Sequence, residues 1–160
     1  MINAQIYQKL AQLIPNMEER LHNNTAFGKS VSEGFMDLHF DSLGKDATGA
    51  YHIALAHYFE QNGDLVPDPD MRIRIDTVAK TAQALSFQNM YVYQEVNPDL
   101  PDTDQNNNTL KKELNLFLSD WLNNALNQGH VIDFTKADAE AKHERTAPKR
   151  NTNPDISDTR

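Results

Sequence analysis

The sequence contains no cysteine, which excludes disulfides, thiol nucleophiles and thiolate metal sites together. A chain of this kind is typical of a reducing compartment, so we expect a cytoplasmic protein. No stretch approaches the roughly 18 apolar residues of a membrane-spanning helix. The N-terminus also lacks the basic start and apolar run of an export signal, so we expect no membrane association.

The sequence motifs of common enzymes are missing as well. There is no nucleophile elbow, no glycine-rich phosphate loop and no glutamate–histidine zinc motif. None of the six histidines has the four-residue spacing of a zinc-binding helix. These absences together favour a protein that is not an enzyme and that uses no cofactor.

Positive charge is scarce, since 15 Lys/Arg stand against 23 Asp/Glu and the formal net charge is −8. Residues 135–160 hold six of the basic and five of the acidic side chains, which leaves −9 on residues 1–134. An acidic domain repels phosphate backbones at long range. We therefore expect nucleic acid to be a disfavoured partner.

Helical periodicity is present near both ends of a single globular domain. Apolar residues from Ile2 to Ile14 recur at helical spacing, and Pro15 predicts a break before a second short turn through Leu21. A longer apolar stripe from Leu110 to Leu126 predicts a helix that starts near Asn108. Gly129 follows this stripe where a left-handed C-terminal cap is expected.

Between these helices the apolar period changes to two, which indicates strands. The predicted strands cover residues 36–41, 51–60, 71–76, the run around 85–87, and 91–96. Asn62-Gly63 predicts a tight hairpin turn, and Pro67 and Pro69 predict an extended connection without ladder donors. The expected fold is therefore α+β, an antiparallel meander of about five strands with N-terminal and C-terminal helices on one face. The domain should cover 1–134, with a disordered tail at 135–160.

Three segments resemble a family of small proteobacterial proteins catalogued as domain of unknown function 1249. They are residues 6–15, the strand at 71–75, and Phe117-Leu118-Ser119-Asp120-Trp121-Leu122 leading to Gly129. The resemblance spans roughly residues 4–132 and implies a shared fold. It implies no activity, cofactor or catalytic residue, because none is established for that family.

Strand alternation gathers cations and aromatics on the sheet face opposite the aliphatic one. The candidate binding residues on this face are His39, His52, Tyr58, Arg72, Arg74, Tyr91 and Tyr93. Arginine and tyrosine are enriched at partner-binding surfaces. The alternative is a packing role, with half-buried tyrosines and with arginines paired across strands to Asp37, Asp41 or Asp76.

Two acidic loops could supply oxygen ligands to a hard cation. One contains Asp64, Asp68 and Asp70, and the other contains Asp99, Asp102 and Asp104. Neither spacing matches a calcium loop with its bidentate glutamate. Aspartate is ordinary in turns and helix caps, so we predict no metal site and leave a cation at these loops as an alternative.

The function expected from these features is a non-enzymatic protein-binding or adaptor module that uses the open sheet face or an edge strand. Its partner is expected to be another protein or a second copy of itself. One alternative is an enzyme that holds a small anionic or nucleotide substrate through Arg72 and Arg74, with His52 or Tyr93 nearby. Another is a weak single-stranded RNA binder, which would stack bases on the exposed aromatics.

Overall fold

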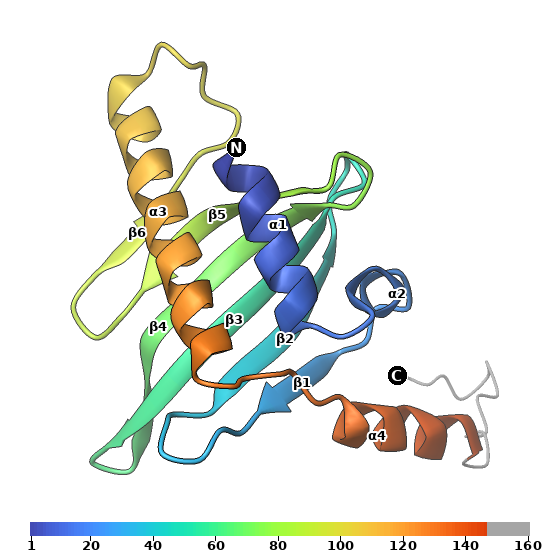
Figure 1. Ribbon diagram of the computed structural model, residues 1–160. Coiled ribbons are helices and arrows are strands. Elements are labelled where there is room, and N and C mark those ends of the chain that lie inside the picture. The colour runs from blue at the N-terminus through green and yellow to red at the C-terminus, as the bar shows by residue number, and fades with distance from the viewer. Residues whose placement is uncertain (147–160) are drawn as a thin grey trace, which may run out of the picture.

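The computed structural model describes residues 1–146 of the chain. The helices are α1 Ile2–Leu13, α2 Met17–His22, α3 Gln105–Asn127 and α4 Thr135–Thr146. The strands are β1 Phe27–Ser30, β2 Leu38–Lys45, β3 Tyr51–Gln61, β4 Asp64–Asp76, β5 Thr81–Gln88 and β6 Tyr93–Glu95. They form one antiparallel sheet in chain order, and α1 and α3 cross one of its faces (Figure 1). The predicted α+β meander is confirmed, with six strands instead of five.

The two longest strands, β3 and β4, form the centre of the sheet. Asn62 and Gly63 join them with φ angles of 54° and 86°, which is the left-handed backbone that a two-residue hairpin turn requires. Gln61 and Asp64 pair directly on either side, so the predicted turn is confirmed. The extended connection expected before residue 71 is instead part of β4, which begins at Asp64 and contains Pro67 and Pro69. Proline can keep an extended φ there, although it contributes no N–H donor to the ladder.

The core lies between the sheet and the helices α1 and α3. Strand alternation turns alternate apolar residues in the central parts of β2, β3 and β4 toward these helices, where they are buried. The fully buried side chains include Phe40, Ile53, Leu55, Met71, Ile73 and Ile75 from the sheet, and Ile6, Leu10, Leu13 and Leu118 from the helices. Trp121 of α3 is only 9% exposed and belongs to the same cluster.

Side chains from the helices close the outer edge of β5 where β6 does not reach it. Asn3 Nδ2 donates to the Ala82 carbonyl at 2.9 Å, and Asn115 Oδ1 accepts from the Ala84 N–H at 2.8 Å. Buried backbone groups need such partners, since an unsatisfied one costs free energy. The two asparagines therefore do for this edge what a neighbouring strand would do.

The chain segment after α3 closes the opposite edge of the sheet. Lys29 of β1 and Asp133 exchange backbone hydrogen bonds of 3.0 and 2.9 Å, and Ile132 N donates to the Leu13 carbonyl at 2.9 Å. Gly28 permits this close approach, since a Cβ there would lie 2.5 Å from Ile132. In Figure 1 the segment crosses beside β1 before α4 begins.

Besides the earlier start of β4, two features of the sheet differ from the sequence-based expectation. The four-residue strand β1 was not predicted, because a run this short with a central glycine carries no clear alternation. The second strand begins at Leu38, and Met36 is 42% exposed, so Met36 is not part of the buried face.

The helix α4 lies within the segment expected to be a disordered tail. Asp133 Oδ1 accepts from the backbone N–H of Thr135 at 2.9 Å, which caps the start of the helix. The Arg20 guanidinium binds both carboxylate oxygens of Asp138, at 2.6 and 3.0 Å, and Ala137 is buried. The remainder of the expected tail lies outside the described residues.

Residues 1–146 contain no helix whose length and apolar content would let it cross a bilayer.

We expect Asn115→Ala to lower the free energy of unfolding by about 1–3 kcal/mol, because the buried N–H of Ala84 loses its acceptor. The matched control is Asn123→Ala, which removes an exposed amide from the same helix and should change stability by no more than about 0.5 kcal/mol. Urea unfolding at neutral pH measures both variants. Equal effects would contradict the edge-closing role of Asn115.

Candidate functional site: the open face of the sheet

The sheet face opposite α1 and α3 carries polar side chains in two adjacent cross-strand rows. The first row contains His39, Ala56 and Asp70, from β2, β3 and β4 in turn. The second row contains Asp41, Ala54 and Arg72 from the same strands. Each alanine of β3 therefore lies between two polar neighbours.

Tyr58 completes this group at one end. A β-bulge in β4, where Asp68 and Pro69 lie opposite His57, shifts the register, so that Ala56 pairs with Asp70 and Tyr58 pairs with Pro67. The Tyr58 ring then packs edge-on against His39, with ring centroids 5.3 Å apart. We call His39, Asp41, Tyr58, Asp70 and Arg72 the open-face cluster.

The carboxylates of the open-face cluster are held in an unfavourable environment. Burial raises the pKa of Asp70; Arg72 acts against this shift and Asp41 adds to it. Asp70 Oδ1 is enclosed and has no hydrogen-bond partner within residues 1–146. Burial also raises the pKa of Asp41, and His39 opposes that shift.

The other titratable members of the cluster respond to the same surroundings. Burial raises the pKa of the Tyr58 hydroxyl, and the negative charges of Asp70 and Asp41 raise it further. Burial lowers the pKa of His39, and the charge of Lys29 adds to this effect while nearby aspartates oppose it. The charges of the cluster thus affect one another, and the rest of the fold does little to offset the cost of burying them.

Arg72 and Arg74 have different surroundings although they are two residues apart. Arg74 Nε donates to Asp46 at 3.1 Å and its Nη2 donates to Thr48 at 2.6 Å. Arg72 is exposed, and no salt bridge joins it to another residue of the described part of the chain. Arg72 is therefore available to a partner, whereas Arg74 is engaged.

Arg74 and His52 together hold the turn between β2 and β3. His52 Nε2 lies 2.8 Å from Asp46 Oδ2, the oxygen that also accepts from Arg74. Hydrogen bonds from Thr48, followed by those from His52 and Arg74, hold the pKa of Asp46 well below its usual range. The alternative in which the arginines pair with aspartates thus holds for Arg74, but its partner is Asp46 and not Asp37, Asp41 or Asp76.

Tyr91 and Tyr93 lie at the far edge of the sheet. Tyr93 is in β6, pairs with Gln88 and is 56% exposed, whereas Tyr91 is in the β5–β6 turn and is 83% exposed. Of the seven candidate residues, His39, Tyr58 and Arg72 come together in the open-face cluster. Asp41 and Asp70 were not among the candidates, although their alternation with Phe40 and Met71 places them on this face.

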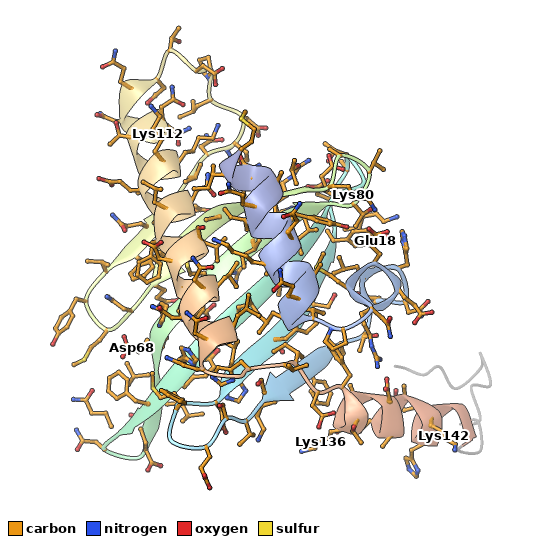
Figure 2. All side chains as sticks on the ribbon, in the orientation of Figure 1. Glu18, Asp68, Lys80, Lys112, Lys136 and Lys142 are labelled. Carbon is orange, nitrogen blue, oxygen red and sulfur yellow. The ribbon has the colours of Figure 1, made fainter. Side chains whose placement is uncertain are left out.

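A groove of about 640 Å³ begins at the open-face cluster and runs toward the β1 edge. His39 and Asp41 form the end that it shares with the cluster, and Lys29 and Lys136 lie along it. Figure 2 shows Lys136 at the start of α4. The groove therefore extends the open-face cluster with two further cations.

A second polar group is buried on the helix side of the sheet. His57 Nδ1 donates to the Asp37 carbonyl at 2.8 Å, and His130 Nδ1 lies 2.7 Å from Ser30 Oγ. The two histidine rings are 5.9 Å apart, and His130 is only 1% exposed. Burial and the neighbouring His57 lower the pKa of His130, while the Met36 carbonyl opposes the shift.

The two acidic loops do not gather their side chains into one group in the part of the chain that is described. No group of three or more His, Asp and Glu side chains converges within residues 1–146 in a way that could hold an ion. Asp70 belongs to the open-face cluster, and Asp104 caps α3 by accepting from the Asn107 N–H at 3.0 Å.

Two helices on one face of a six-stranded meander, with a charged cluster on the other face, define an open-faced α+β protein. The chain belongs to the family described as Domain of unknown function (DUF6908), whose model matches residues 5–131. This match includes all six strands and the whole open-face cluster. No curated protein and no solved structure matches the chain. A family of unknown function across most of the chain is thus confirmed, whereas the resemblance to domain of unknown function 1249 is not.

Acidification should destabilise the fold through His130. The pKa of His130 in the folded protein lies below the ordinary value of 6.5. As the pH falls, His130 is therefore protonated in the unfolded chain before it is protonated in the folded chain. The free energy of unfolding is therefore not reduced by His130 above pH 6.5. It falls as the pH drops below this value, with a limiting slope of about 1.4 kcal/mol per pH unit from this residue. Urea unfolding between pH 7.5 and 5 should show a shallower loss in His130→Asn. The control is Asn123→Ala, which removes an exposed, non-titrating side chain of α3 and should keep the pH dependence of the wild type.

Asp70→Asn should stabilise the isolated protein at neutral pH. The raised pKa means that ionised Asp70 opposes folding, and this cost is present above its folded pKa and vanishes as the carboxyl becomes protonated. Thermal unfolding should therefore show a higher Tm for Asp70→Asn at pH 7.5 and a smaller difference at pH 4. Asp64→Asn, which removes an exposed carboxylate from the same strand, serves as the control. A loss of stability at pH 7.5 in Asp70→Asn would contradict this account.

Proposed function

We propose that this protein is a non-enzymatic protein-binding module and that its partner docks on the open face of the sheet. The partner presents a basic side chain to Asp41 and Asp70 and a carbonyl or carboxylate to Arg72. Ala54, which is half-buried, is the small residue between Asp41 and Arg72 at the middle of the face. The encounter is placed in the cytoplasm, the usual compartment of a chain without cysteine.

The unsatisfied oxygen of Asp70 is the observation that carries the proposal. Enclosed polar atoms almost always have a hydrogen-bond partner in a folded protein. Asp70 Oδ1 has none within residues 1–146, and burial already disfavours its charge. A carboxylate that costs stability in the free protein is expected where the opposite charge of a bound partner offsets that cost.

The charge of the whole protein supports a basic partner. The formal net charge of −8 attracts cationic surfaces at long range and repels acidic ones. At short range, the carboxylates of the open-face cluster accept hydrogen bonds from lysine or arginine. Long-range attraction and local recognition therefore favour the same kind of partner.

The two alternatives receive less support from the same geometry. An enzyme for a small anionic substrate would need Arg72 and Arg74 together, but Arg74 is engaged by Asp46 and Thr48. The carboxylates of Asp41 and Asp70 would repel such a substrate and would equally repel the phosphates of single-stranded RNA.

The test is capture of partners from a lysate with the full chain, followed by affinity measurement with the purified partner. Arg72→Ala and Asp70→Asn should each weaken binding at least about tenfold, since truncating a hot-spot residue at the centre of an interface costs about 2 kcal/mol or more. Binding should also weaken as the salt concentration rises, because the recognition is ionic.

Asp64→Asn is the matched control for the binding experiment. It removes the same charge from the same strand at an exposed position outside the open-face cluster, so it should bind as the wild type does. If Asp64→Asn and Asp70→Asn weakened binding equally, the effect would come from the net charge of the protein and not from the position of Asp70. A partner that binds Asp70→Asn normally would refute the proposed site.

A further inference from the structure

The two edges of the sheet are not equally protected. Asp133 pairs with β1, and Asn3 and Asn115 close the part of β5 that lies beyond β6. No comparable group covers β6 within residues 1–146, and all three of its residues are exposed. An uncovered strand edge is a template for pairing with another chain.

The hydrogen bonds on either side of β6 define which of its backbone groups are free. Asn89 N donates to the Val92 carbonyl at 3.0 Å, and Val96 N donates to the Leu85 carbonyl at 2.8 Å. In an antiparallel ladder, bonded and non-bonded pairs alternate, so Gln94 is the β6 residue that bonds to β5. The N–H and C=O groups of Tyr93 and Glu95 consequently point away from the sheet.

The hairpin that leads into this edge is uncharged up to Gln94, although the protein as a whole is acidic and Glu95 of β6 carries one charge. Residues 81–94 contain no Asp, Glu, Lys or Arg. Four consecutive residues of the hairpin, Met90, Tyr91, Val92 and Tyr93, are 43%, 83%, 46% and 56% exposed. Two copies of an acidic protein repel each other least when they meet at a neutral surface.

We propose that β6 pairs antiparallel with β6 of a second copy of the chain, with Gln94 on the two-fold axis. Tyr93 then faces Glu95 of the other copy and exchanges both backbone hydrogen bonds with it. Because Glu95 lies opposite a tyrosine, the two Glu95 carboxylates are not paired directly. A two-fold arrangement closes after two copies and joins the two sheets into one.

The register makes a specific prediction for a cross-link. Gln94 of one copy lies opposite Gln94 of the other, in a pair without backbone hydrogen bonds. The Cα atoms of such a pair lie about 4.5 Å apart, which is within the range that a disulfide spans. The chain has no other cysteine, so Gln94→Cys gives a single reactive thiol. Under mild oxidation, its covalent dimer should form at least tenfold faster than that of Gln61→Cys, an exposed position at the end of β3.

A proline at position 93 tests whether the backbone makes the contact. The N–H of Tyr93 points outward, so Tyr93→Pro removes a hydrogen bond between copies and none within the hairpin. In the Gln94→Cys background, Tyr93→Pro should reduce the cross-linking rate to that of Gln61→Cys, whereas Tyr93→Ala should retain most of it. Circular dichroism of each variant checks that the fold persists.

The mass of the cysteine-free protein provides a second readout. Sedimentation equilibrium should show a monomer–dimer equilibrium that moves to monomer in Tyr93→Pro. A monomer at every concentration, or equal cross-linking rates for Gln94→Cys and Gln61→Cys, would overturn the proposal. This inference is independent of the proposed partner site, since Arg72 and Asp70 are on β4 and do not contribute to the β6 edge.

Discussion

The architecture depends on one constraint: α1 and α3 cover only one face of a six-stranded sheet. The covered face is largely apolar, and its apolar residues form the core. The other face must remain compatible with water, so the same strands carry polar side chains on alternate positions. Both the stability of the fold and the chemistry of the open-face cluster follow from this division.

Within the open face, the charges are used in two distinct ways. At the β2–β3 turn, Asp46 is fully satisfied by Thr48, His52 and Arg74, and its charge stabilises the fold. In the open-face cluster, Asp70 lacks such partners and its charge opposes folding. The two groups lie on the same strands, so the contrast reflects the local arrangement and not a general property of the sheet.

Much of this could be predicted from the sequence, because alternation of apolar and polar residues determines which side of a strand is buried. It placed His39, Tyr58 and Arg72 on one face, and Asn62-Gly63 located the central hairpin. The same pattern contains Asp41 and Asp70, but their importance depends on burial, which alternation does not reveal. Long-range contacts were also invisible, including the asparagines that close β5 and the four-residue strand β1.

The pairing of β1 with Asp133 has a consequence for how the protein is made. Residue 29 leaves the ribosome long before residue 133, and translation proceeds at about 5–20 residues per second. For several seconds the nascent chain therefore carries a strand whose outer backbone groups have no partner, although β2 can already pair with its inner side. The sheet can assemble during synthesis, but the outer edge of β1 can be covered only when translation of the domain is nearly complete.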